Sequence, residues 1–140
     1  MALDGKFSHQ NLDIDPGTMR KDAALISVDH SYVGRWEAGT APHWYRLIIE
    51  PVDYLTLFVE TDFGPHTEVR FLWATDGGRV TEVKPVDIYE LEDRKVSAVV
   101  MKVWYPAQIY HPNFKRMITI FIGIEGVDNL HYRFKVEAPK

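Results

Sequence analysis

Residues 117–137 read MITIFIGIEGVDNLHYRFKVE, and this stretch decides the fold class. Its second half alternates apolar and polar side chains at every step, which is the period-two pattern of a β-strand with one buried and one wet face. The apolar set is Leu130, Tyr132, Phe134 and Val136, and the polar set is His131, Arg133, Lys135 and Glu137.

The first half of the same stretch is apolar on both faces. Isoleucines fill one face at every second position from 118 to 124, and Met117, Phe121 and Gly123 leave the other face mostly apolar. Such a strand needs cover on both sides, which predicts either contact with a partner subunit or the lining of an apolar cavity. A homodimer formed through the strand from Phe114 to Ile124 is one consequence.

From residue 33 onward the chain contains about eight stretches that alternate in this way and are rich in β-branched and aromatic residues. They span residues 33–38, 43–50, 54–61, 67–75, 79–91, 95–105, 114–124 and 130–137. Asp76-Gly77-Gly78 suits a tight hairpin turn, and Gly126-Val127-Asp128-Asn129 is expected to close the last pair of strands. Pro85 lies inside the 79–91 stretch and predicts a sheet edge, a bulge or two shorter strands.

We predict an all-β fold of about eight antiparallel strands in a meander, closed into an up-and-down β-barrel, because closure removes exposed sheet edges. An immunoglobulin-like β-sandwich is the alternative. The length of 140 residues suits one domain. Residues 1–30 are expected to form an irregular N-terminal arm with one short strand at 24–28, and residues 31–140 to form the barrel or sandwich.

Charge and composition exclude several classes of function. The net charge is −4 and the 16 Lys and Arg residues are dispersed, so we predict no nucleic-acid partner. The absence of cysteine excludes disulfides and thiolate metal sites. The first residues lack the pattern of a secretory signal, and no apolar run reaches the length of a membrane span, which predicts a cytoplasmic protein without a membrane partner.

Two short motifs carry a resemblance to a known family. Gly34-Arg35-Trp36 stands on the first clear strand, and Tyr132-Arg133-Phe134 lies near the end of the last. This layout resembles the lipocalins and the wider calycin family of ligand-binding barrels, in which an arginine lies across the tryptophan ring and closes one barrel end. The resemblance implies that Trp36 and Arg133 form this closing pair through a cation–π contact. The final two strands also resemble those of bacterial immunoglobulin-like domains.

Aromatic residues with a polar atom are the candidates for ligand binding, because the ring supplies contact area and the N–H or O–H group fixes orientation. Arg46 shares a strand face with apolar residues, so it is expected either to anchor a ligand carboxylate or to form an outer-face salt bridge. The predicted ligand-binding residues are Trp44, Arg46, Trp73, Trp104 and Tyr132.

No catalytic motif is present in the sequence, and no His-x-His pair indicates a metal site. We therefore predict no cofactor and no metal, assign no catalytic residue and leave the enzyme question open. The expected function is binding of a small, partly apolar molecule in an aromatic-lined barrel cavity. The alternatives are an immunoglobulin-like protein-interaction module or oligomer subunit, and an isomerase, cyclase or lyase on a calycin-type barrel.

Overall fold

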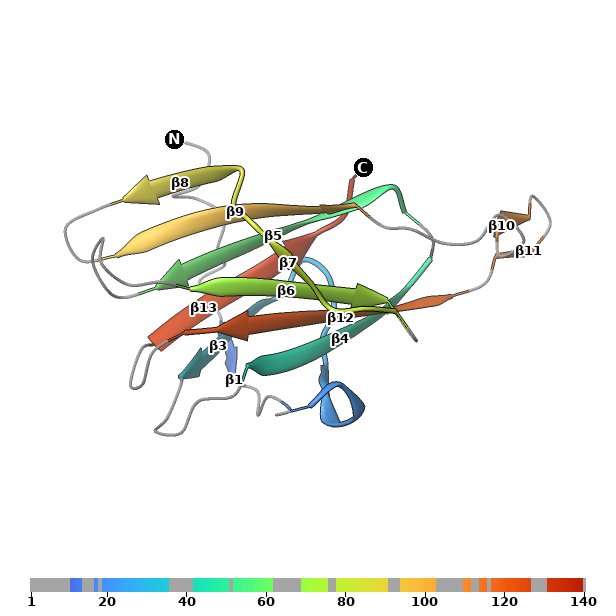
Figure 1. The fold of residues 1–140 in the computed structure, drawn as a ribbon, viewed down its shortest axis with the longest axis horizontal. Helices are drawn as coiled ribbons and strands as arrows, with labels where there is room; N and C mark the ends of the chain where they lie inside the picture. Colours follow the sequence, from blue (N-terminus) through green and yellow to red (C-terminus); the bar gives the residue numbers. More distant parts are fainter. Residues whose placement is uncertain are drawn as a thin grey trace.

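The computed structural model describes residues 11–13, 17, 19–35, 42–50, 52–61, 69–75, 78–90, 94–102, 110–111, 114–115, 117–126 and 131–139. These residues form two mostly antiparallel β-sheets (Figure 1). The first sheet contains, in spatial order, β1 (Asn11–Asp13), β3 (Ser31–Arg35), β13 (His131–Glu137), β5 (Tyr54–Thr61), β9 (Lys95–Lys102) and β8 (Asp87–Glu90).

The second sheet contains β2 (Ala24–Leu25), β4 (His43–Ile49), β12 (Ile118–Glu125), β6 (Arg70–Thr75) and β7 (Thr81–Val83), in that order. A separate pair is formed by β10 (Tyr110–His111) and β11 (Phe114–Lys115). The all-β prediction is confirmed, but the two sheets are not closed into a barrel.

The predicted meander is wrong, because most strands pair with strands that are distant in the sequence. β13 lies between β3 and β5, and β12 lies between β4 and β6. The last two strands were expected to pair as a hairpin, yet they belong to different sheets. The physical reason is that each has an apolar face that must be buried, and placing β12 and β13 on opposite sides of one core buries both.

The stretch at 79–91 is divided into two shorter strands, which is one of the three alternatives that Pro85 predicted. β7 ends at Val83 and β8 begins at Asp87, and the two strands belong to different sheets. The chain therefore changes sheet at Lys84, Pro85 and Val86, where a missing backbone donor costs no ladder hydrogen bond.

The N-terminal segment, predicted to be an irregular arm with one short strand, contributes to both sheets. β1 pairs in parallel with β3, and β2 pairs in parallel with β4. Between β1 and β2 in the sequence, a short 3-10 turn, η1 (Arg20–Asp22), lies against β4. The Arg20 guanidinium donates a 2.7 Å hydrogen bond to the carbonyl of Gly78, beyond the end of β6, which ties this segment across the second sheet.

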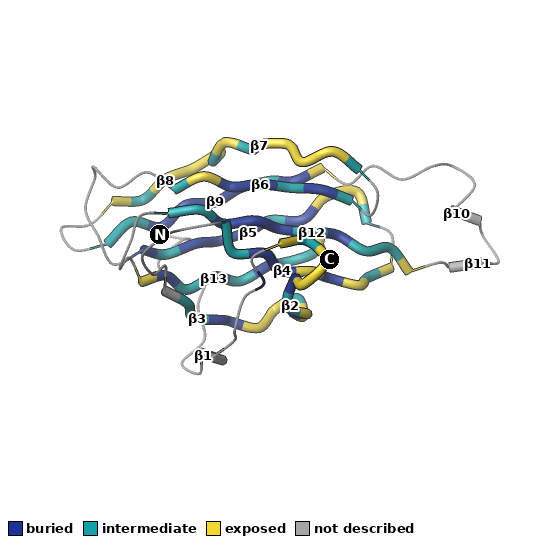
Figure 2. Tube along the Cα trace, turned by 60° about the horizontal axis from the view of Figure 1, so that its bottom comes forward, coloured by how far each residue is buried: buried dark blue, intermediate teal, exposed yellow. Residues whose placement is uncertain are grey.

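One hydrophobic cluster joins the two sheets, and Figure 2 shows the buried positions running along the middle of the central strands. Each sheet contributes the side chains of alternate residues. The first sheet supplies Tyr32, Leu55, Leu57, Val59, Val99, Met101, Tyr132, Phe134 and Val136, and the second supplies Tyr45, Leu47, Phe71, Ile120, Ile122 and Ile124. The alternation predicted for residues 130–137 is confirmed over the described positions of β13.

In the described part of the chain, no helix has the length and apolar character needed to cross a membrane.

Candidate functional site

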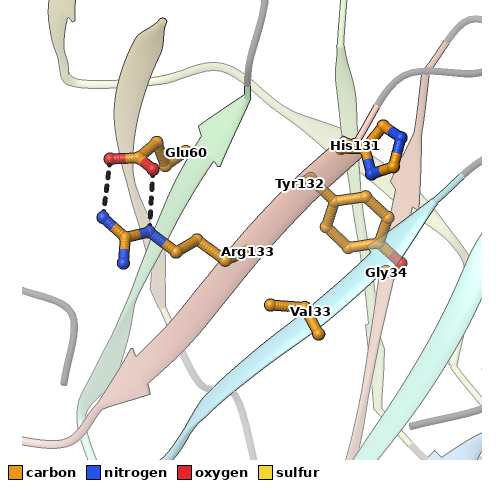
Figure 3. A pocket seen from close by; sticks show the side chains of 6 residues that line it. All are labelled: Val33, Gly34, Glu60, His131, Tyr132 and Arg133. Carbon is orange, nitrogen blue, oxygen red and sulfur yellow. Dashed lines mark hydrogen bonds and ion pairs between the residues drawn. The ribbon is translucent and has the colours of Figure 1, made fainter. Parts of the chain in front are cut away.

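A pocket of about 210 Å³ lies at one end of β3, β5 and β13 (Figure 3), and we call it the Arg133 pocket. It is lined by Val33, Gly34, Glu60, His131, Tyr132 and Arg133. Strand register explains the grouping, because Val33 is opposite Arg133 and Arg133 is opposite Glu60. These three residues form one row across three neighbouring strands, on the face of the sheet that points away from the core.

Charged groups converge at one wall of this pocket. Arg133 forms a bidentate ion pair with Glu60, with Nε donating to Oε1 at 2.8 Å and Nη2 donating to Oε2 at 3.0 Å. Arg94 also donates to Glu60 Oε2, at 3.3 Å. The side chains of Glu60 and Arg133 are 14% and 25% exposed, so this pair is shielded more than an ordinary surface salt bridge.

Gly34 and Tyr132 also line the pocket, and on the core side of the sheet the Tyr132 ring lies in close contact with Gly34. A Cβ atom at Gly34 would lie 2.6 Å from both Cζ and Oη of Tyr132, which is closer than real Cβ contacts. Only glycine therefore leaves room for the Tyr132 ring to pass over β3 and enter the core.

The Tyr132 hydroxyl belongs to a buried hydrogen-bonded chain that crosses from one sheet to the other. It bonds to the hydroxyl of Tyr45 and, at 2.7 Å, to Nδ1 of His43; both partners lie on β4. Burial raises the pKa values of Tyr45 and Tyr132, so both phenols stay protonated. Burial also lowers the pKa of His43, which favours the neutral imidazole.

The tautomer of His43 decides which hydroxyl donates in this chain. If His43 accepts at Nδ1, Tyr132 donates to it and Tyr45 donates to Tyr132, so both hydroxyl protons are used. Phe134 packs beside the chain, with its ring centroid 4.5 Å from that of Tyr45 and 6.0 Å from that of Tyr132.

The described residues of the predicted ligand-binding set lie in different parts of the structure. Tyr132 lines the Arg133 pocket, whereas Trp73 packs against the main core. Trp44 is buried on the outer face of the second sheet, and Arg46 is exposed on the same strand. Trp104 lies outside the described residues.

Of the predicted closing pair, Trp36 and Arg133, the structure describes Arg133 alone. Trp36 lies outside the described residues, so its contact with Arg133 stays a prediction. Arg133 itself is bound to Glu60, the residue opposite it on β5.

The second apolar face of β12 is covered in part by the chain itself. Trp44 and Leu72 lie over Gly123, where an added Cβ atom would come within 3.0 Å of both side chains. Ala23 completes this small outer cluster, and Phe121 packs against it. Neither a partner subunit nor a cavity lining is needed to account for this part of the apolar pattern.

Sequence reasoning missed Glu60, His43, Tyr45 and Gly34 as a group. Glu60 sits at an ordinary polar position of an alternating strand, and nothing local distinguishes it. The usable signal is the run His43-Trp44-Tyr45. It places His43 and Tyr45, two polar aromatic residues, on the strand face that also carries the apolar Leu47.

A second, larger hollow of about 470 Å³ lies at the other end of the first sheet, lined by Asp53, Tyr54, Val100 and Lys102. Asp53, Tyr54 and Lys102 are exposed. The Arg133 pocket is the stronger candidate because its charged groups are partly buried and held by hydrogen bonds. No protein-family model matches this chain, and no curated protein matches it, so the site is assigned from its own geometry.

Proposed function

We propose that this protein binds a small, partly apolar molecule in the Arg133 pocket. The observation that carries the proposal is the bidentate pair between Arg133 and Glu60, placed beside Val33 and the bare backbone of Gly34. Such a pocket offers a fixed polar wall and an apolar wall, which is the combination that orients a small ligand.

The pocket volume limits the size of the ligand. Pockets for drug-sized molecules are typically about 300 to 1,000 Å³. The Arg133 pocket, at about 210 Å³, is smaller. With about 30 Å³ for each water molecule in the liquid, it corresponds to roughly seven waters, so we expect a ligand with on the order of ten non-hydrogen atoms.

Preorganisation supports binding at this position. Glu60 accepts hydrogen bonds from two arginines, so the guanidinium of Arg133 is already held in place before a ligand arrives. When the donor side chain is already fixed, binding does not have to immobilise it, and the entropy cost of binding is smaller. His131 adds an imidazole ring to the lining of the pocket.

We further propose that the two sheets form a β-sandwich. This arrangement is supported by the shared core between them and by the crossover order of their strands. In a sandwich the interior is filled with side chains, so the ligand would sit on an outer face, in place of the enclosed barrel cavity that the sequence suggested.

Filling the pocket tests the proposal. Val33→Trp adds bulk from the apolar wall, on a side chain that points away from the core, and the matched control Thr119→Trp adds the same bulk to the outer face of β12. Native mass spectrometry of protein purified from its own host, followed by a fragment screen by ligand-observed NMR, measures occupancy. We expect binding in the wild type and in Thr119→Trp, and at least tenfold weaker binding in Val33→Trp.

Two results would count against a small-molecule site. If no small molecule co-purifies and no fragment binds, the protein has no such site at this pocket. If Val33→Trp binds as tightly as the wild type, the ligand sits elsewhere. A dimer mass without bound ligand would favour the alternative of an interaction module or oligomer subunit.

A further inference from the structure

The outer face of the second sheet keeps exposed apolar side chains at one end of β4 and β12. Ile48 and Met117 are 44% and 51% exposed, and Phe121 beside them is half-buried. At the other end of the same face, the Trp44 ring lies over Gly123 and the surface is covered. The exposed part of the face therefore begins where this cover ends.

Strand register places six outward-facing side chains in three rows, which we call the β4–β12 strip. They are Arg46, Ile48 and Glu50 along β4, and Phe121, Thr119 and Met117 along β12. Ile48 is opposite Thr119 in the middle row, and Arg46 is opposite Phe121 in one outer row. Glu50 and Met117 make the third row, one step beyond the end of the ladder.

The strip is complementary to itself about its middle row. A two-fold axis that runs along this row, parallel to the sheet and across the strands, places a second copy face to face with the first and reverses its strand direction. Each outer row then meets the opposite outer row of the copy. Arg46 faces the second copy's Glu50, and Phe121 faces the second copy's Met117.

Both of these contacts are of favourable kinds, and symmetry makes each of them occur twice. A guanidinium meets a carboxylate, and a thioether meets an aromatic ring. Glu50 also interacts within its own chain, and the two oxygens of a carboxylate can accept a further bond from the second copy's Arg46. An axis parallel to the strands and along β4 would instead place Arg46 against its own counterpart, which brings like charges together.

We propose that the β4–β12 strip is a homodimer interface, in which two copies of the chain pack sheet against sheet about the axis along the middle row. A second copy is the occupant that the pattern selects, because the charges of the strip match those of the same strip after the rotation. The Arg133 pocket lies on the outer face of the other sheet. Loss of the dimer should therefore leave ligand binding unchanged.

Sedimentation velocity of the full chain over a range of concentrations tests the interface. A face only a few strands wide belongs to the small interfaces, so we expect a dimer at about 100 µM that dissociates on dilution towards about 1 µM. Ile48→Lys places two like charges on the axis and should leave only monomer at about 100 µM. The matched control is Ile88→Lys, at a residue that is 45% exposed on the edge strand of the first sheet, and it should still dimerise.

Charge reversal tests the direction in which the two copies meet. Arg46→Glu and Glu50→Arg should each weaken association at least tenfold, because each brings like charges together at both symmetric contacts. In an equal mixture of the two variants, one copy has two acidic residues and the other two arginines, so association should return. Lys102→Glu makes the same change in net charge on the first sheet and is the control. Circular dichroism and urea unfolding show whether each variant is folded.

Several results would overturn this interface. A monomer at every concentration would show that the strip does not associate. A dimer that persists in Ile48→Lys would place the contact elsewhere on the molecule. If the mixture stays monomeric although both variants fold, the copies do not meet about this axis. A different protein bound to the strip, seen as a heteromeric mass in protein from its own host, would exclude a second copy as the occupant.

Discussion

Gly34 shows how a single residue positions the candidate site. Its missing side chain leaves the space that the Tyr132 ring occupies, and Tyr132 in turn reaches the two polar residues of β4. The sequence contains Gly34-Arg35-Trp36 as a visible motif, and we expected its importance to lie in Trp36. The described structure instead shows a steric requirement at the glycine.

Gly34→Ala is therefore expected to lower the free energy of unfolding by about 1–3 kcal/mol, because the added methyl overpacks the contact with Tyr132. Urea denaturation measures this change. In a Tyr132→Leu background, where the ring is removed, the same substitution should cost clearly less. Equal costs in the two backgrounds would show that the contact does not carry the effect.

The burial of His43 determines whether its protonation raises or lowers the stability of the fold. Burial lowers the pKa of the folded imidazole below about 6.5, its value in an unfolded chain. The unfolded state then binds a proton more readily than the folded state. This contribution to stability is fully present above about pH 6.5 and is lost as the pH falls through the folded pKa.

At the scale of the strand, β12 is the element on which the second sheet is organised. Its isoleucines at 120, 122 and 124 have no exposed surface, and it pairs with β4 on one side and β6 on the other. The sequence predicted that this strand needs cover on both faces. The structure shows that Trp44 and Leu72 cover part of the second face. Strand patterns cannot reveal this, because both residues lie on neighbouring strands that are distant from β12 in the sequence.

Ile122→Ala is expected to destabilise the protein by about 2–5 kcal/mol, because it leaves a cavity in the core between the sheets. The matched control is Ile48→Ala on the neighbouring strand, where the residue is 44% exposed. This control should change stability by no more than about 0.5 kcal/mol. Thermal or urea unfolding of the pair measures the difference, and similar losses would place Ile122 outside the core.

At the scale of the whole molecule, the topology makes most pairings non-local. β3 must find β13, and β4 must find β12, across nearly the whole length of the chain. Loop closure over such separations is entropically costly, and it must occur before the paired strands stabilise each other.

We therefore expect refolding in milliseconds to seconds, the range of two-state all-β domains with non-local pairing. Stopped-flow tryptophan fluorescence after dilution from denaturant gives the rate. Refolding within microseconds would contradict the crossover order of the strands, since a meander of local hairpins folds with much shorter loops.

The sequence by itself determined that the chain is all-β, where most of the strands lie, and which side chains of β13 enter the core. These features follow from local periodicity and from residue types that favour strands, and each can be read within a window of about ten residues. The break at Pro85 is of the same kind, because it depends on a missing backbone donor.

The tertiary structure alone decided which strands pair, and this pairing brings the residues of the candidate site together. Glu60, Arg133 and Val33 form one row because β5, β13 and β3 are neighbours in a particular register. His43 and Tyr45 meet Tyr132 because two apolar faces close on each other. Period-two alternation specifies which face a residue occupies and carries no information about the strand opposite. Neither the pocket nor the contact of Tyr132 with Tyr45 and His43 could therefore be derived from the sequence.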